Sequence, residues 1–450
     1  MILRDYQENT IRKIYKSMAA GNKRPLVCLP CGSGKTVIFC RLAEMTAAKN
    51  NTVYILVHRR ELYKQTKDTL ALFGNNPNVS VHMAQTLSLH LAEYEQPNLI
   101  ITDECHMAQA ATWRRIYEHW PESYVIGFSA SPCRLDGKPL GEIFDDLILG
   151  KTTSELIDDK WLAPYEYYSI NVADLTGLKQ RGSDYDASDA ADKLDTLTIY
   201  GDVIETFRKR CSDARAVAYC VNIEHSKNTA AAFQKAGYKA VHIDGTISNK
   251  KRDKIIEDFR SGAIQIITNC DIVSTGFDLP DITACLMLRP TMSTGLYVQQ
   301  SGRALRPQKN KTAIILDFVG NYTRHGLPDD DRNWSITEQM GGKRRINEHG
   351  EFLIRTCLEC YAVYPNTLDV CPICGAPYEL TKTEIKNMEE IELERIEKNR
   401  ILKEKMWALS DEAVDEAKTY SDFCTIAKHR GYKTGWAWHR AKQRGVWTPY

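Results

Sequence analysis

The 450-residue sequence has almost no net charge and no long apolar run. Its 59 Lys and Arg residues nearly balance 58 Asp and Glu residues, which leaves a formal net charge of +1. A near-neutral chain has no global attraction to nucleic acid, so any such contact must come from local patches. No apolar run approaches the roughly 20 residues needed to span a bilayer. The first residues, Met1 to Asp5, also lack the pattern of a signal peptide.

The sequence also lacks the cysteine pattern of a disulfide-bonded protein. Its 14 cysteines are many, but most stand singly in apolar segments, as Cys28, Cys220, Cys270 and Cys285 do. Such cysteines are typical of inert buried thiols in a reducing compartment.

Short apolar segments alternate with helix-like segments twice along the chain. This alternation predicts two α/β domains, each with a parallel sheet covered by helices. The candidate strands of the first domain are residues 25–29, 52–57, 79–83, 98–102 and 124–128. Those of the second domain are residues 214–220, 238–243, 263–268, 282–288 and 312–318. We interpret the polar, acidic residues 171–200 as an insertion or connector.

A glycine-rich loop follows the first candidate strand. Residues 29–36 read Leu-Pro-Cys-Gly-Ser-Gly-Lys-Thr and open a helix-like segment. In such a loop, Gly32, Ser33 and Gly34 let backbone N–H groups converge on phosphate oxygens, and Lys35 meets the β- and γ-phosphates. The hydroxyl of Thr36 can hold Mg²⁺. Leu29 stands where the general pattern has its first glycine.

Two adjacent carboxylates end the fourth candidate strand. Asp103 follows the apolar residues 98–102, at the sheet edge where α/β proteins place ligands. There it can reach Mg²⁺, while Glu104 can orient and deprotonate an attacking water. The two motifs together predict a nucleoside triphosphatase.

Four cysteines near residue 360 have metal-ligand spacing. Cys357 and Cys360 form one pair, and Cys371 and Cys374 form the next pair ten residues later. Two such pairs suit tetrahedral coordination of Zn²⁺ by four thiolates. So short a segment has little core of its own, so its folding would depend on the metal. The zinc would be structural or would contact DNA.

The end of the sequence combines basic and aromatic residues. From Ser421 to Tyr450 it has six Lys or Arg residues and one Asp. Lys433, Trp436 and Arg440 are the candidates for phosphate contact and base stacking. The alternative is that the basic residues complement helix dipoles and the tryptophans form a small core.

These observations divide the chain into six parts. They are domain 1 (1–160), domain 2 (161–328), a linker (329–351), a four-cysteine module (352–380), a charged helix (381–409) and a basic aromatic helical tail (410–450).

The ordered motifs resemble those of superfamily 2 DExH-box helicases. Before the loop stands Leu3-Arg4-Asp5-Tyr6-Gln7, which resembles the adenine-recognising segment of that family. The other motifs resembling the family's are residues 57–62, 85–87, 103–106 (Asp-Glu-Cys-His), 129–131 (Ser-Ala-Ser), 275–278 and 299–306. The resemblance implies two tandem RecA-like domains and an ATP-dependent, Mg²⁺-dependent helicase. The run Ser-Pro-Cys-Arg-Leu-Asp-Gly at residues 131–137 and the cysteine module most resemble RadD-type bacterial or phage DNA-repair helicases. This resemblance implies a cytoplasmic protein.

The resemblance also assigns roles residue by residue. Arg4 and Gln7 would read adenine, and Arg303 and Arg306 would act as arginine fingers beside Gln299. Gly276 and Asp278 would contact the nucleotide. His106, Ser129 and Ser131 would couple the site to domain motion. The residues expected to face nucleic-acid backbone are Arg60, Gln85, Thr86, Arg134 and Thr268.

The expected activity is ATP-driven unwinding or remodelling of forked, branched or partly single-stranded DNA. A single-strand-binding or repair protein is an expected partner. Two alternatives stay open at this point: an RNA helicase, and an ATP-gated clamp or sensor that binds nucleic acid without separating strands.

Overall fold

The computed structural model describes residues 1–107, 111–134, 136–169, 177–195, 197–270, 282–338, 354–357, 359–377, 408–410 and 412–446. The chain forms two compact units, Met1–Ala376 and Pro377–Tyr450. Residues 275–278, with the expected nucleotide contacts Gly276 and Asp278, lie outside the described residues, as does most of the expected charged helix. No described helix is long and apolar enough to cross a membrane.

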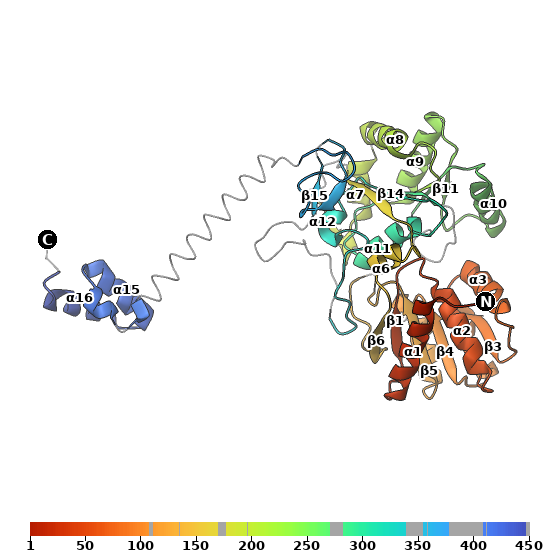
Figure 1. The fold of residues 1–450 in the computed structure, drawn as a ribbon, viewed down its shortest axis with the longest axis horizontal. Coiled ribbons are helices and arrows are strands. Elements are labelled where there is room, and N and C mark those ends of the chain that lie inside the picture. Colours follow the sequence, from red (N-terminus) through yellow and green to blue (C-terminus); the bar gives the residue numbers. More distant parts are fainter. Residues whose placement is uncertain are drawn as a thin grey trace. The chain divides into compact units, whose positions relative to one another are not determined.

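The first lobe of the larger unit is a six-stranded parallel sheet between layers of helices (Figure 1). Its strand order is β3-β2-β4-β5-β1-β6. The strands are β1 (Pro25–Cys28), β2 (Val53–Val57), β3 (Val79–Met83), β4 (Leu99–Asp103), β5 (Tyr124–Ser129) and β6 (Asp146–Leu149). The helices are α1 (Asp5–Ala19), α2 (Lys35–Ala47), α3 (Arg60–Ala71), α4 (Ala84–Leu87) and α5 (Ala111–His119), with 3₁₀ turns at Leu91–Glu93 and Cys105–Met107.

The second lobe repeats this architecture with the strand order β11-β12-β10-β13-β14-β7. Its strands are β7 (Tyr165–Ser169), β10 (Ala216–Tyr219), β11 (Ala240–Ile243), β12 (Ile266–Asn269), β13 (Ala284–Met287) and β14 (Ala313–Asp317). The helices from the lobe boundary onward are α6 (Thr153–Asp158), α7 (Ala187–Leu194), α8 (Leu197–Cys211), α9 (Ile223–Lys235), α10 (Asn249–Ser261), α11 (Thr294–Ala304) and α12 (Tyr322–His325). The prediction of two tandem parallel α/β domains is confirmed.

Both sheets depend on short strands that are buried on both faces. Every residue of β1, β2, β4, β10, β12 and β13 is buried. Strands covered by helices on both sides are apolar throughout, which is why the sequence shows them as runs. The edge strands β6 and β7 were not predicted, because Asp-Leu-Ile-Leu and Tyr-Glu-Tyr-Tyr-Ser mix polar and apolar residues.

Residues 177–195 form a packed part of the second lobe, which corrects their interpretation as a connector. They contain the hairpin of β8 (Gln180–Arg181) and β9 (Asp184–Tyr185), followed by α7. The Asp184 carboxylate accepts hydrogen bonds from the Thr291 hydroxyl and the Met292 N–H. Leu194 of α7 lies in the core of the lobe.

The four-cysteine module adds a hairpin of β15 (Ile354–Thr356) and β16 (Val363–Pro365) to the second lobe. Ala362 pairs with Tyr168 of edge strand β7, and the Ser169 N–H donates to the Tyr361 carbonyl at 2.9 Å. Three of the four cysteines belong to the hydrophobic core of this lobe. The module is therefore packed onto the second lobe.

The smaller unit contains three described helices: α14 (Ala413–Glu416), α15 (Tyr420–Arg430) and α16 (Thr434–Gln443). Phe423, Ile426 and Ala427 of α15 pack against Ala437 and Ala441 of α16. This small core confirms the predicted helical tail.

Close packing at Gly127 of β5 makes a test of the first lobe. A Cβ there would lie 2.6 Å from the Phe144 ring and 2.8 Å from Cys105 Sγ. We expect Gly127→Ala to destabilise the lobe by about 1–3 kcal/mol through overpacking, measured as a lower melting temperature. Gly201→Ala is the control, because no atom lies within 4 Å of its Cβ position in α8. Equal melting temperatures for the two variants would contradict this packing.

Candidate nucleotide and nucleic-acid sites

The loop between β1 and α2 has the backbone of a phosphate-binding loop. Gly32 and Gly34 both adopt φ of +80°, a conformation that favours glycine. No side chain caps the N-terminus of α2, so its first N–H groups are available to an anion. Lys35 Nζ donates to the carbonyl oxygens of Leu29 and Pro30, at 3.2 and 3.3 Å. The Lys35 side chain therefore lies against the loop in which it is predicted to bind phosphate.

The segment before α1 lies against this loop. Tyr6 Oη donates to the Ser33 carbonyl at 2.5 Å, and a Cβ on Gly34 would lie 2.7 Å from Gln7 Nε2. The Gln7 Oε1 atom accepts from the Arg4 N–H at 3.0 Å. The expected adenine-reading residues thus begin next to the phosphate loop.

Beside this segment, a cavity of about 470 Å³ has the size for a base. The Arg4 guanidinium lies 4.0 Å from the centroid of the Trp161 ring, which lines the cavity. Lys151 and Asp159, also in the lining, form an ion pair. These three residues were missed in the sequence, because they reach the site from the boundary between the lobes and stand in no motif.

Asp103 and Glu104 lie at the C-terminal end of β4. Asp103 is buried, and burial together with the neighbouring Glu104 charge raises its pKa. Burial alone would raise the pKa of Glu104, but contact with His106 and the charge of Lys35 lower it below its usual range. The contacts with His106 and Lys35 thus favour the ionised form of Glu104, which is the form that can accept a proton.

Glu104 has a strained backbone. Its φ of +51° lies in the left-handed region, where a residue other than glycine costs about 1–3 kcal/mol. The turn sends the chain from β4 directly into the 3₁₀ turn at Cys105–Met107 and leaves both carboxylates near Lys35. Burial lowers the pKa of Lys35, but nearby Cys31, Glu104 and Asp103 outweigh this effect and raise it.

His106 connects the carboxylates to β5. Its Nδ1 atom lies 3.3 Å from Glu104 Oε2 and 3.3 Å from Ser129 Oγ. Ser129 Oγ in turn donates to the Ser131 carbonyl at 2.7 Å. The three residues expected to couple the site to motion therefore form one connected chain.

Helix α11 of the second lobe lies directly on the phosphate loop. A Cβ on Gly302 would lie 2.7 Å from Cys31 Cβ, and a Cβ on Gly32 would lie 3.4 Å from Arg306 Cγ. Arg303 is buried and close enough for its charge to lower the pKa of Asp103 and Glu104. Both expected arginine fingers thus lie at the loop.

Several buried polar atoms around this point have no hydrogen-bond partner among the residues that the structure describes. They include both amide atoms of Gln299, the hydroxyls of Ser33 and Ser131, and His106 Nε2. Buried polar groups are ordinarily paired, so their concentration here fits a polar ligand. Together with the glycine-rich loop and Lys35, this donor set suits a triphosphate with its Mg²⁺ held by Thr36 and Asp103.

A groove of about 1330 Å³ runs between α3 of the first lobe and α10 of the second. Arg60 and Thr86, both expected to contact nucleic acid, line it. The neighbouring Gln85 is exposed and donates from Nε2 to the His58 carbonyl at 3.4 Å. The two lobes are linked across this region by an Arg252–Glu61 ion pair at 3.1 Å.

Two other expected nucleic-acid contacts are engaged with protein. Arg134 forms an ion pair with Asp136 at 3.0 Å. Thr268 is fully buried in β12, where its hydroxyl donates to the Ser226 carbonyl at 2.7 Å. In this arrangement of the lobes, the Thr268 side chain faces the protein interior.

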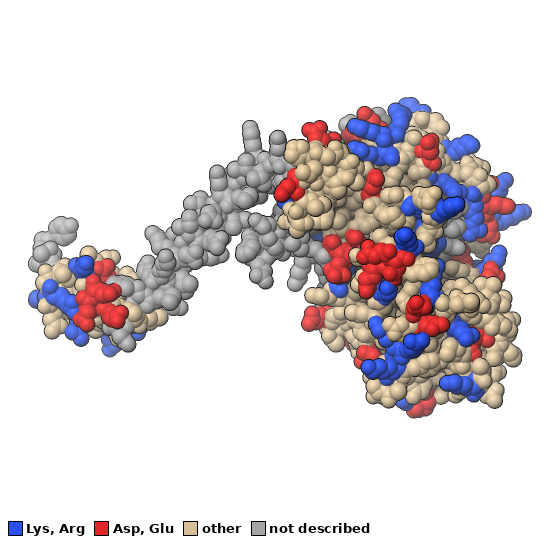
Figure 2. All heavy atoms as spheres, viewed as in Figure 1, with Lys and Arg blue, Asp and Glu red and all other residues tan. Residues whose placement is uncertain are grey.

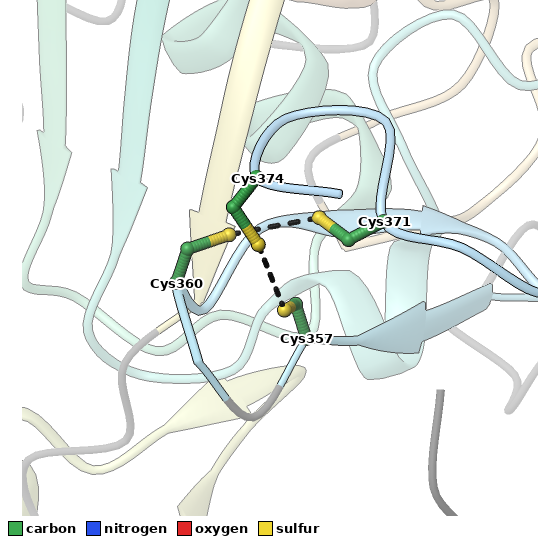
Figure 3. Close-up of side chains that lie close together, drawn as sticks. All are labelled: Cys357, Cys360, Cys371 and Cys374. Carbon is green, nitrogen blue, oxygen red and sulfur yellow. Dashed lines mark hydrogen bonds between the residues drawn. The ribbon is translucent and has the colours of Figure 1, made fainter. Parts of the chain in front are cut away.

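The four cysteines of the module converge (Figure 3). All four Sγ atoms of Cys357, Cys360, Cys371 and Cys374 lie within 4.8 Å of one another. The shortest separations are 3.6 Å, for Cys357 with Cys374 and for Cys360 with Cys371. Four convergent thiols fit one tetrahedral ion.

In the smaller unit, Trp436 contributes to packing. Its ring lies 4.7 Å from that of Tyr432 and 6.3 Å from that of Phe423. The Arg440 guanidinium lies 6.0 Å from the same ring, and Lys433 precedes the helix. Packing therefore accounts for Trp436, whereas Lys433 and Arg440 are exposed.

Comparison with known proteins places both lobes in described families. Residues 1–86 and 75–134 match the family "Type III restriction enzyme, res subunit", and residues 199–308 match "Helicase conserved C-terminal domain". A 51.5 kDa protein of a Lactococcus phage is 37% identical over 83% of this chain and 82% of its own length.

Two further likenesses extend over the lobes. The putative ATP-dependent helicase IRC3 of Saccharomyces cerevisiae is 31% identical over 71% of this chain, which spans only 52% of that protein. The structure of a putative HsdR subunit fragment of a type I restriction enzyme from Vibrio vulnificus is similar with a TM-score of 0.60. It is 21% identical and covers 73% of this chain and 66% of its own. The latter likeness concerns the fold alone.

The carboxylate assignment makes a direct prediction. We expect Glu104→Gln to lower the kcat for ATP hydrolysis by about 10²–10⁴-fold, because the amide cannot accept a proton, while ATP affinity changes little. Steady-state ATPase and equilibrium nucleotide binding measure the two effects. The control is Glu122→Gln, an exposed acid of the same lobe paired with Lys23. Normal turnover by Glu104→Gln would contradict the assignment.

Proposed function

This chain belongs to the superfamily 2 helicases, and from that premise we propose that it is a DNA translocase. It would use ATP to unwind or remodel forked, branched or partly single-stranded DNA in repair, recombination or replication. The observation that carries the proposal is the contact of α11 with the phosphate loop, because residues of both lobes then form the ATP site. The RadD-type resemblance stays a prediction.

As a helicase-family member, the chain is a nucleic-acid-dependent ATPase. Lys35 and the N–H groups at the start of α2 would hold the triphosphate, with Gln7 and Arg4 at the base. Mg²⁺, held by Thr36 and Asp103, would neutralise the charge that develops on the phosphates. Glu104, ionised beside His106, would orient the water and take its proton.

Arg303 and Arg306 make hydrolysis depend on the position of the second lobe. A guanidinium at the transferring phosphoryl group contributes about 10³–10⁵ in rate. Because Arg303 lies on α11 and Arg306 follows directly after its C-terminal end, both reach the loop only when the lobes are apposed. ATP would therefore hold the lobes together, and product release would let them part. Through the contacts of Glu104 with His106 and of His106 with Ser129, a change in the charge or position of the carboxylates would shift the end of β5.

Nucleic acid bound across both lobes would move with this cycle. The groove between α3 and α10 presents Arg60 and Thr86 from the first lobe, and Gln85 lies beside them. Backbone contacts of this kind give affinity without reading sequence. A restriction-enzyme family model over the first lobe supports DNA as the polymer.

We also propose that the four cysteines hold a structural Zn²⁺. Cys357, Cys360 and Cys371 are buried in the core of the second lobe, and the Cys360 carbonyl accepts from Arg210 of α8 at 2.8 Å. A metal at this position would fasten β7 and α8 to the hairpin. The metal would be structural and not catalytic, because four thiolates leave no open coordination position.

Steady-state ATPase tests the motor proposal. Rates would be compared without nucleic acid and with single-stranded DNA, forked DNA or matched RNA, at one salt concentration, and followed by strand displacement on the fork. We expect stimulation by DNA forms and ATP-dependent displacement. Equal or greater stimulation by RNA would favour an RNA helicase. ATP-dependent retention without displacement would favour a clamp, and either result would overturn the proposal.

Metal analysis tests the zinc proposal. Cys371→Ser removes a buried ligand, so we expect bound zinc to fall well below one ion per chain and the melting temperature to drop, because the metal supports the fold. Cys424→Ser, in the smaller unit, is the matched control and keeps its zinc. Unchanged metal content in Cys371→Ser would remove the site.

A further inference from the structure

The smaller unit joins two helices through a three-residue turn. Helix α15 ends at Arg430, residues 431–433 form the turn, and α16 begins at Thr434. Gly431 ends α15 with a φ of +67°, a left-handed conformation that favours glycine at the end of a helix. Helix-turn-helix units likewise consist of two packed helices joined by a turn of three or four residues that often contains glycine, and they read DNA with their second helix.

We propose that residues 412–446 are a helix-turn-helix unit that binds duplex DNA, with the exposed face of α16 entering the major groove. This site is separate from the motor, since it requires neither ATP nor the two lobes.

Charge in this unit is segregated along the chain. Residues 411–422 contain five acids and one Lys, whereas residues 423–446 contain six Lys or Arg residues and no acid. On the smaller unit, Figure 2 shows acidic side chains gathered in one group with basic side chains around it. The half that contains α16 is thus the half complementary to phosphate.

Two of the six basic residues hold the unit together. Arg430 donates to the carbonyls of Ala408 and Ser410, and Arg444 pairs with Asp415. Arg440 and Lys442 form no ion pair with a described carboxylate; their cations lie 6.0 and 5.0 Å from the rings of Trp436 and Trp438. Arg440 Nη1 donates to Gln443 Oε1 at 3.2 Å, on the exposed side of the helix. These two cations are therefore in place for phosphate oxygens.

The face of α16 opposite its core carries groups that can read bases. Ala437 and Ala441 point into the core of the unit, so Gly435, His439 and Gln443 lie on the opposite side of the helix, where all three are exposed. Imidazole and amide groups offer the donors and acceptors that base edges match in the major groove.

Gly435 points to a close approach by a ligand. It lies in the first turn of a helix without a positive φ, and no atom lies within 4 Å of its Cβ position. Among the described residues, neither backbone conformation nor packing requires glycine there. A glycine with no internal reason is expected where another backbone comes close, and recognition helices contact DNA through their N-terminal residues.

The test uses the full chain without nucleotide, with fluorescence anisotropy on a duplex of about two helical turns and on single strands of the same length. We expect Gly435→Leu to weaken duplex binding about tenfold or more by steric exclusion from the groove, with an unchanged or higher melting temperature because leucine favours helix. Gly201→Leu is the matched control, since its Cβ position in α8 is equally open. Unchanged duplex affinity in Gly435→Leu would overturn the proposal.

A second pair of variants does not depend on helix packing. We expect Arg440→Ala and Lys442→Ala each to reduce the slope of log affinity against log salt by about 0.9, as one phosphate contact is lost. Lys418→Ala, in the acidic half of the unit, should leave the slope unchanged. A larger loss for single strands than for duplex would assign the unit to base stacking and overturn the proposal.

The ATPase of these variants separates the two proposals. At saturating forked DNA, the kcat of Gly435→Leu and Lys442→Ala should stay within about twofold of the parent, because these two variants leave the motor site intact. Duplex binding through α16 without any DNA stimulation of ATPase would remove the motor proposal and leave this one standing. DNA-stimulated ATPase with unaltered duplex binding in all three variants would do the reverse.

Discussion

The catalytic site depends on one close contact between lobes, that of Gly302 with Cys31. At this position even a methyl group would lie 2.7 Å from the Cys31 side chain. The absence of a side chain lets α11 lie on the phosphate loop, and this contact brings Arg303 close enough to influence both carboxylates. The other steps of the proposed cycle, from activation of the water to separation of the lobes, depend on this contact between α11 and the loop.

That approach concentrates charge in a buried place, which sets the chemistry. Asp103 and Arg303 are buried and Lys35 and Glu104 are partly buried in one cluster, where groups of opposite charge offset the cost of burying each one alone. The positive φ of Glu104 is part of the same arrangement, because a strained turn delivers the second carboxylate to the cluster. Polar atoms such as those of Gln299 have no hydrogen-bond partner among the described residues. A triphosphate would give them partners.

The sequence predicted the parts of the molecule that local chemistry determines. All ten candidate strands are present, because buried parallel strands are continuous apolar runs, and the four cysteine thiols converge as their spacing indicated. The edge strands β6 and β7 were missed, since half-exposed strands carry mixed residues. The contribution of Trp161 was missed for another reason: it meets Arg4 only after the chain has folded. The interior position of Thr268 likewise follows from sheet packing rather than from its motif.

The placement of the cysteine module on β7 has a consequence for the behaviour of the chain in solution. Strand β7 is an edge of the second sheet, and Tyr361 and Ala362 cover part of its hydrogen-bonding groups. An uncovered sheet edge is a template for pairing with other chains. A metal held by the module would therefore protect against self-association. Chains made under zinc starvation would be lost to aggregation, so that supply of a trace nutrient would set how much of this ATPase accumulates.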